Sequence, residues 1–291
     1  MWVLGLVFLL CFSGVADANA GLFQKTAKNA VLHIPWDESK TVTWEFNQKD
    51  WGTWNVFGVS VNKEPISARS GTDWEYVYLG RPTTTSAWYE WMGGNHQNEI
   101  LKTLDFIVDG KKVQDGTYKV SESLVIVETT DLVFPADNMI VGSVVRRYTI
   151  EVGSPNRMDF AQSTTWHTDM YMDRAYVCML PIYKRHGRFF KMGNVEDSFV
   201  DGIRTDANKG LAPVTETFLY GDMGYGMIAG IKDLSAVDEY KYSKWGAFIW
   251  DLSADHVKLY YPRAYEMGPR FVEAGSVWES ESYYIVVEVN E

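Results

Sequence analysis

The sequence predicts an all-β protein, built as one large antiparallel β-sandwich with few short helices. Apolar and polar residues alternate with a period of two over most of the chain, which is the pattern of strands with one buried face. Turn signals such as Asp109-Gly110 and Asp115-Gly116 separate these runs and favour tight hairpins. No long segment has the 3.6-residue period of an amphipathic helix, although 234–242 could form a short one.

The predicted strands follow one another with no linker-like or low-complexity stretch between them, so 21–291 is expected to be a single sandwich domain. The polar, glycine-dotted segment 195–213 is expected to be a long loop, and such loops tend to be functional. The basic segment 184–188 is expected to be a solvated turn. Strands are predicted at 41–46, 54–61, 74–79, 99–108, 123–128, 141–152, 157–166, 176–183, 189–192, 215–219, 226–231, 246–252, 257–261 and 277–289.

The N-terminus has the features of a secretory signal peptide covering residues 1–20. An apolar run at 2–12, too short to remain as a membrane span, precedes the small-x-small cleavage site Ala18-Asn19-Ala20. No Lys or Arg precedes that run, so an uncleaved anchor is the alternative. Cleavage would leave Cys178 as the one cysteine, in an apolar run that predicts a buried, inert thiol. The protein is therefore expected to be secreted, to the extracellular space or the periplasm, without a stable membrane anchor.

Charge and composition narrow the classes of partner. The formal net charge of −11 argues against nucleic acid as the main partner, but a local basic cleft on an acidic protein can still hold an anionic glycan. The chain has 12 Trp and 17 Tyr, side chains that fill cores and also stack on sugar rings. It contains no phosphate-binding loop, dinucleotide fingerprint, zinc-finger spacing or nucleophile elbow.

The stretch 88–99 carries a first polar cluster. Gly93 and Gly94 follow an aromatic run and allow the backbone to turn sharply. The polar residues after this turn lie beside the aromatic side chains of Trp88 and Trp91, an arrangement that suits a polar, ring-shaped ligand. A solvated hairpin loop is the alternative. The cluster consists of Asn95, His96, Asn98 and Glu99.

A second polar cluster, Trp166-His167-Thr168-Asp169, stands at the end of a predicted strand. His167 shares its strand face with Asp159, Ser163 and Thr165, and this polar face would suit the floor of a wet groove. The alternative is a purely structural His167, hydrogen-bonded at a strand end.

Two other strands raise the question of which face is buried. Arg146 and Arg147 are adjacent, so they must point to opposite faces of their predicted strand. If both faces are covered, one arginine is an inward charge that needs an anionic partner. Trp74, Tyr76 and Tyr78 share one face of an earlier strand, either as part of the core or as a stacking platform.

The residue types in the two clusters fit removal of a proton next to a uronate carboxylate. His96 or His167 would act as base or acid, because imidazole titrates near neutral pH. Asn95 and Arg147 would neutralise the substrate carboxylate so that an enolate can form. The predicted substrate contacts are Trp88, Trp91, Glu99, Trp166 and Asp169.

Two other chemistries stay open. Hydrolysis of a glycosidic bond needs two carboxylates across that bond, and nothing in the sequence pairs the available ones, which are Glu90, Glu99, Asp169 and Asp173. The spacings His96-x-x-Glu99 and His167-x-Asp169 would suit metal ligands, but such short pairs occur by chance. No metal or cofactor is expected.

Three passages resemble the β-sandwich shared by galactose mutarotase-like proteins and many polysaccharide lyases. They are Gly-Gly-Asn-His-x-x-Glu at 93–99, the stretch from 147–150 through Trp166-His167 to 176–181, and Gly275-Ser276-Val277-Trp278 before the last strand. The resemblance covers about residues 85–290. It implies a sandwich closed by its tail strand, with a sugar bound across a concave sheet.

The leading hypothesis is a secreted carbohydrate-active protein, in its sharpest form a polysaccharide lyase that cleaves a uronate-containing glycan by β-elimination. The expected partner is a polysaccharide or oligosaccharide, neutral or anionic, and not nucleic acid. One alternative is a non-catalytic glycan-binding or surface-assembly protein. The other is a sugar epimerase or glycosidase on the same scaffold.

Overall fold

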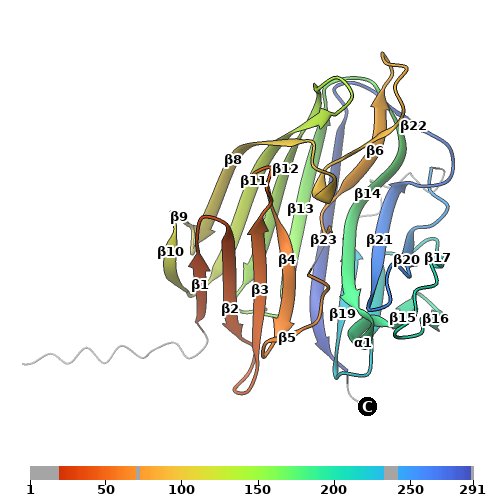
Figure 1. The fold of residues 1–291 in the computed structure, drawn as a ribbon. Coiled ribbons are helices and arrows are strands. Elements are labelled where there is room, and N and C mark those ends of the chain that lie inside the picture. The colour runs from red at the N-terminus through yellow and green to blue at the C-terminus, as the bar shows by residue number, and fades with distance from the viewer. Residues whose placement is uncertain (1–19, 70–72, 233–241, 290–291) are drawn as a thin grey trace, which may run out of the picture.

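The computed structural model describes residues 20–69, 73–232 and 242–289, and it confirms the predicted all-β fold (Figure 1). The named strands form three sheets with antiparallel pairing throughout. The six-stranded sheet has the order β10 (Gly116–Val120), β1 (Gly21–Lys25), β2 (Asn29–Pro35), β3 (Thr41–Gln48), β4 (Trp54–Val61) and β5 (Glu64–Pro65).

The other two sheets are longer. The ten-stranded sheet has the order β16 (Val195–Ser198), β15 (Phe189–Met192), β18 (Glu216–Tyr220), β19 (Tyr225–Ile231), β23 (Val277–Glu288), β13 (Arg157–Trp166), β12 (Met139–Glu151), β11 (Ser123–Phe134), β8 (Glu99–Val108) and β9 (Lys111–Val113). The seven-stranded sheet has the order β17 (Asn208–Leu211), β20 (Ala247–Trp250), β21 (His256–Ala264), β14 (Met170–Tyr183), β6 (Val77–Pro82) and β7 (Glu90–Met92), with β22 (Arg270–Val272) also paired to β14.

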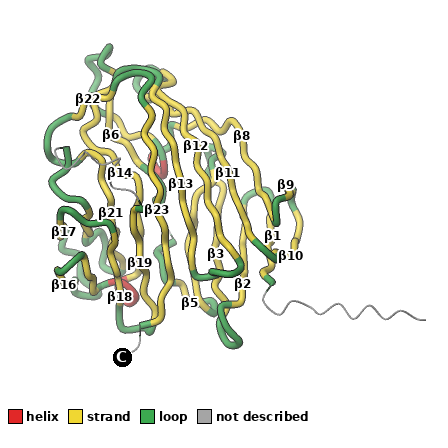
Figure 2. The backbone as a smooth tube through the Cα atoms, turned by 180° about the vertical axis from the view of Figure 1, so that it is seen from behind, coloured by secondary structure: helices red, strands yellow, loops and turns green. Residues whose placement is uncertain are grey.

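The ten-stranded sheet forms one layer of a sandwich, and the other two sheets lie side by side against it (Figures 1 and 2). One buried cluster joins side chains from all three sheets, for example Trp44, Phe106 and Leu180. The two smaller sheets are linked where Ser67 bridges to Ile182 and the Ala68 amide donates to the Pro181 carbonyl. The sandwich therefore has one continuous layer and one composite layer.

The alternation seen in the sequence accounts for these layers. Along β13 every second side chain is buried, from Met158 to Trp166, while the others face outward. The aromatic stripe Trp74, Tyr76 and Tyr78 is fully or almost fully buried, so it belongs to the core and offers no platform for a ligand.

One arginine is directed inward, as the adjacent pair predicted. Arg146 is fully buried, and its Nη2 lies 2.9 Å from Glu128 Oε2 and 3.6 Å from Glu99 Oε1. Its guanidinium carbon also lies 5.5 Å from the ring centre of Tyr76. Arg147 is exposed on the opposite face of the ten-stranded sheet. Burial raises the pKa of Glu99 and raises that of Glu128 to about 7, because one guanidinium does not fully offset two desolvated carboxylates.

Buried carboxylates also tie the six-stranded sheet to the core. Glu128 Oε1 accepts the Trp54 amide at 3.0 Å, and Glu75 Oε1 accepts the Val56 amide at 2.8 Å. β4 has β5 as a partner on that edge only at Ser60 and Val61. The carboxylates therefore satisfy buried strand-edge donors that would otherwise be unpaired.

Two sequence predictions about loops were wrong. Segment 184–188 is not a solvated turn, because Lys184–Gly187 forms the short helix α1 and Lys184 is fully buried. The Lys184 Nζ lies 2.6 Å from Asp251 Oδ1, and this distant partner cannot be recognised from the basic run itself. Segment 195–213 is not one long loop, because it contains β16 and β17. Residues 234–241 of the helix expected at 234–242, and residues 1–19 of the expected signal peptide, lie outside the described residues.

Candidate functional site

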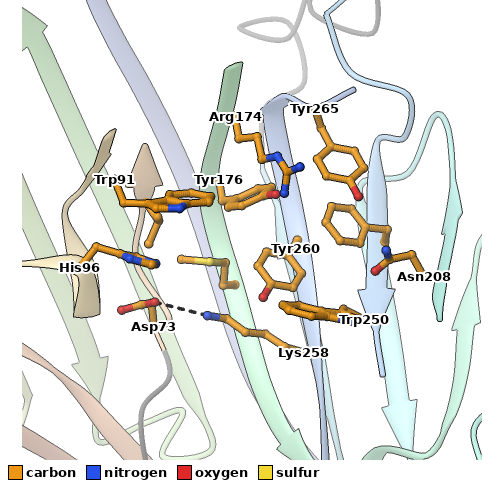
Figure 3. A pocket seen from close by; sticks show the side chains of 13 residues that line it. Asp73, Trp91, His96, Arg174, Tyr176, Asn208, Trp250, Lys258, Tyr260 and Tyr265 are labelled. Atoms are coloured by element: carbon orange, nitrogen blue, oxygen red, sulfur yellow. Dashed lines mark hydrogen bonds and ion pairs between the residues drawn. The ribbon is translucent and has the colours of Figure 1, made fainter. Parts of the chain in front are cut away.

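A pocket of about 310 Å³ lies on the outer face of the seven-stranded sheet (Figure 3). Successive side chains of β21 point to opposite faces of the sheet. Val257, Leu259 and Tyr261 therefore join the core. Lys258 and Tyr260 point to the other face and line the pocket. The lining residues are Asp73, Val77, Trp91, His96, Arg174, Tyr176, Met179, Asn208, Phe248, Trp250, Lys258, Tyr260 and Tyr265.

Aromatic side chains form most of the wall. His96 stacks on Trp91 with ring centres 4.8 Å apart and planes at 17°, and Trp91 stacks on Tyr176 at 6.3 Å. Further along, Phe248 stacks on Tyr260 at 4.8 Å and on Tyr265 at 4.6 Å. A pocket with aromatic faces and polar edges is suited to a ring that is apolar on its faces and hydroxylated at its rim.

The Gly93-Gly94 turn positions His96. Both glycines have positive φ, +84° and +54°, and the short 3₁₀ helix η1 (Gly94–His96) follows. A Cβ at Gly93 would overlap the Tyr76 ring, and a Cβ at Gly94 would overlap the Asp73 carboxylate. The absence of both side chains lets the loop pack tightly enough to bring His96 over Trp91.

Substituting Gly94 with alanine is therefore expected to destabilise the fold by about 1–3 kcal/mol, because the side chain would both strain the backbone and displace Asp73. Chemical denaturation measures this change. Gly153→Ala is the matched control: its added Cβ meets no atom within 4 Å, so a shift below about 0.5 kcal/mol is expected. Equal effects of the two substitutions would contradict the proposed role of the close packing at Gly94.

A buried ion pair crosses the pocket floor. Lys258 Nζ lies 3.4 Å from Asp73 Oδ2, and both side chains are 6% exposed, so the pair is shielded from bulk water. Burial lowers the pKa of Lys258, and Asp73 opposes that shift. Asp73 also accepts the backbone amide of Asn95, so the same carboxylate joins the loop that carries His96 to β21. Asn95 in turn accepts a hydrogen bond from Lys49 and does not line the pocket.

Arg174 and three tyrosines form the opposite side. The Arg174 guanidinium carbon lies 5.5 Å from the ring centre of Tyr265, and its side chain is 41% exposed. Burial raises the pKa of Tyr176 and Tyr260, and raises that of Tyr265 to about 12. All three phenols are therefore protonated at neutral pH and can donate hydrogen bonds.

The described lining carries charged groups of both signs. It includes two basic side chains, Arg174 and Lys258, and one carboxylate, Asp73. Burial lowers the pKa of His96, with Lys258 adding to the shift and Asp73 opposing it, so the imidazole is neutral at pH 7. Each basic side chain has a carboxylate beside it: Lys258 pairs with Asp73, and Arg174 Nε lies 3.6 Å from Asp173 Oδ2. Arg174 is the more exposed of the two, so it is the cation that an anionic ligand would meet.

The structure brings together only part of the predicted site. His96 and Trp91 line the pocket, whereas Glu99 and Trp166 are buried in the core and present no surface to a ligand. Trp88 is 86% exposed and lies outside the pocket lining. We therefore leave Trp88, Glu99 and Trp166 out of the proposed site.

Arg147, His167 and Asp169 are also separate from the pocket. Arg147 faces outward from the ten-stranded sheet, and the arginine that lines the pocket is Arg174. His167 Nε2 lies 3.3 Å from Ser143 Oγ, and Asp169 Oδ1 accepts the Ala274 amide at 2.7 Å, so both have structural partners at the β13–β14 turn.

The two predicted polar clusters do not form one site. In register, Glu99 pairs with Leu132, Leu132 with Gly142, and Gly142 with Trp166. Three strand spacings separate the Cα atoms of Glu99 and Trp166 by about 14 Å. That span exceeds one sugar ring and its contacts, so the composite site that used both histidines is not assembled.

Several pocket residues carried a signal that the sequence analysis missed. Lys258 and Tyr260 alternate with Val257, Leu259 and Tyr261, so they share the opposite face of this predicted strand. A lysine in such an apolar strand indicates an exposed or paired position. Asp73, Asn208 and Trp250 had no comparable signal, because they come from a loop and from two strands whose neighbours are set by the fold.

No protein-family model matches the sequence, and no curated protein matches it at a level that indicates kinship. Solved structures share the fold. The α-galactosidase from Lactobacillus brevis matches with a TM-score of 0.52 and 6% identity, covering 89% of this chain and 40% of its own. The α-galactosidase AgaB from Geobacillus stearothermophilus matches with a TM-score of 0.51 and 9% identity, covering 91% and 41%. A putative aldose 1-epimerase from Klebsiella pneumoniae subsp. pneumoniae gives a TM-score of 0.45 and 9% identity, covering 89% and 79%.

The chain thus spans about two fifths of the length of these α-galactosidases, and identities this low establish a shared fold alone. The β-sandwich of this chain is therefore a fold that it shares with parts of these α-galactosidases, and the sandwich itself is the architecture that the sequence predicted.

Two further findings concern the described residues. Within 20–69, 73–232 and 242–289, no helix is long and apolar enough to span a bilayer. In that same part of the chain, no group of three or more His, Cys, Asp or Glu side chains is placed to hold a metal ion.

Proposed function

We propose that this protein is a secreted carbohydrate-active protein whose pocket binds one ring of an anionic glycan and cleaves the chain beside it by β-elimination. The observation that carries the proposal is the pocket itself, where stacked aromatic walls meet Arg174, Lys258 and a neutral imidazole at His96. Its volume of about 310 Å³ lies at the small end of ligand pockets, which suits a single sugar ring. The solved structures named as α-galactosidases lend support for a sugar ligand.

The proposed reaction uses two groups with opposite pKa shifts. His96 takes the proton from the carbon next to the uronate carboxylate, and the electron pair forms a C=C bond as the bond to the glycosidic oxygen breaks. Tyr260 returns a proton to that oxygen. Burial lowers the pKa of His96 and raises that of Tyr260, so at pH 7 one is a free base and the other a protonated acid.

The remaining lining residues would stabilise the charge that develops. Arg174 and Asn208 are placed on the pocket rim (Figure 3), where they would neutralise the substrate carboxylate and allow the enolate to form. Lys258 stays paired with Asp73, and this pair would fix the floor of the pocket and the loop that carries His96. The products are a chain end with an unsaturated uronate and a second chain with a free hydroxyl.

Hydrolysis fits the pocket less well. Among the lining residues that the structure describes, Asp73 is the one carboxylate, and it is engaged by Lys258 and by the Asn95 amide. A glycosidase needs two carboxylates across the scissile bond. Secretion remains part of the proposal on the strength of the sequence at 1–20, and N-terminal sequencing of the mature protein, with Gly21 expected first, tests it.

Incubation with alginate, ulvan, glucuronan and pectate tests the function. A new ultraviolet absorbance from unsaturated uronate is expected with at least one polymer, and none with the neutral controls cellulose and galactan. Calorimetric binding of a uronate polymer without new absorbance would support the non-catalytic glycan-binding alternative. Neither binding nor absorbance on any uronate polymer, across varied pH and calcium, would sink the proposal.

A further inference from the structure

A second hollow, of about 290 Å³, lies beside the pocket on the far side of β17. β17 is the last strand of the seven-stranded sheet, and β15 and β16 end the ten-stranded sheet, so this hollow forms where the edges of the two layers approach each other. Phe190 and Met192 of β15 line its buried side and are 2% and 1% exposed. Val195 of β16, at its mouth, is 40% exposed.

The hollow and the pocket are adjacent, because Asn208 at the start of β17 lines both. Trp245, which lines the hollow, packs against the pocket wall: its ring centre lies 5.4 Å from that of Phe248 and 5.7 Å from that of Tyr265. Figure 3 shows Asn208 at the edge of the pocket beyond Tyr265. A ligand that fills both spaces must therefore pass Asn208.

The shape of the hollow depends on Gly210. A Cβ at that position would lie 2.5 Å from the Trp245 ring and 2.8 Å from Phe248 Cβ, so only glycine lets the indole lie against the β17 backbone. Such close approach of a ring to a strand leaves the space beside it open.

The chemistry of the hollow suits a sugar ring. Trp245 and Leu211 provide apolar surface. The rim carries polar groups from Asn208 and from the pair Lys209 and Asp197, whose Nζ and Oδ1 are 2.8 Å apart. Apolar surface with a few polar groups at its edge matches the faces and hydroxyls of a pyranose.

We propose that this hollow is a second subsite, which holds the sugar unit adjacent to the one in the pocket. The inference rests on the proposed function, and it deepens it: the ligand is an oligomer or polymer that crosses β17 at Asn208, and binding requires at least two linked units for full affinity. A free monosaccharide occupies the pocket alone.

The test compares chain lengths in the full-length protein. Probes are glucuronate, mannuronate and their oligomers of two to four units, with Kd measured by calorimetry, or KM where an oligomer is turned over. In the wild-type protein the second unit is expected to tighten binding about tenfold or more, the scale of one well-packed anchor. Val195→Trp fills the mouth of the hollow and is expected to reduce longer oligomers to the affinity of a single unit.

Val277→Trp is the matched control, since Val277 is 52% exposed at one end of β23 and lines neither cavity. Circular dichroism and thermal melting establish that both variants fold, and the exposure of Val195 makes a folded variant the expected result. If affinity is independent of chain length, or if the gain survives in Val195→Trp, the second subsite is overturned while the proposed function stands. If no uronate of any length binds, both are overturned.

Discussion

Replacing His96 with alanine is expected to lower kcat on the uronate polymer by about 10²–10⁴-fold, the contribution typical of a positioned general base. His96 is the one histidine in the described pocket lining, and its ring is held by stacking on Trp91 at 4.8 Å. Because binding also involves Arg174 and the aromatic walls, KM is expected to change far less than kcat.

The pH profile provides a second signature of His96. The base must be unprotonated, so activity falls as pH drops through the pKa of His96 in the folded protein. Burial places that pKa below its ordinary value of 6.5, so kcat/KM should stay level down to below pH 6.5 before it declines. His167→Ala is the matched control, because His167 lies outside the lining, and its kcat should match the wild type. Equal losses in the two variants would contradict the assignment of His96 as base.

Replacing Arg146 with methionine is expected to lower the free energy of unfolding by about 3–5 kcal/mol, because one partner of a buried charge network is removed and its carboxylates remain buried. Glu128 and Glu99 lie within 2.9 and 3.6 Å of the guanidinium and would lose their compensating cation. Urea denaturation at several pH values measures the change.

The pH dependence of that loss has a definite sign. The folded pKa values of Glu99 and Glu128 are already raised above the ordinary value of 4.5, so their contribution to stability is full below 4.5 and is lost as pH rises through the folded pKa values. Without Arg146 these pKa values rise further, so the destabilisation should be greater at pH 8 than at pH 5. Arg147→Met, on the exposed face of the same strand, should change stability by less than about 0.5 kcal/mol. A loss at Arg146 that is the same at both pH values would argue against unpaired carboxylates as its cause.

Much of the strand pattern was predictable because it is local. The predicted bounds of β4, β8, β13 and β15 agree with the structure, since alternation within a strand reports which side chains are buried. The opposite directions of Arg146 and Arg147 followed from the same period. In contrast, β1 and β2 were not predicted, although Phe23, Ala30 and Leu32 are fully buried in the core.

The candidate site was predictable only in part. His96 and Trp91 were identified because Gly93-Gly94 marks a turn beside aromatic residues, and the same two glycines prove necessary for the close packing against Tyr76 and Asp73. The prediction that His96 and His167 lie in one site required their two strands to be close together. The distance between two strands depends on their order in the sheet, which the sequence pattern does not contain. Three strand spacings separate those two clusters.

By itself the sequence determined the fold class, the outward or inward direction of most strand side chains, and the presence of a polar aromatic turn at 88–99. The tertiary structure decided which of those outward side chains meet. Asp73 and Lys258 are 185 residues apart and form the pocket floor, and Lys184 is buried because Asp251 lies beside it. The physical reason is that a period of two encodes the face of a residue, whereas the neighbours of a strand are selected by packing of the whole sandwich.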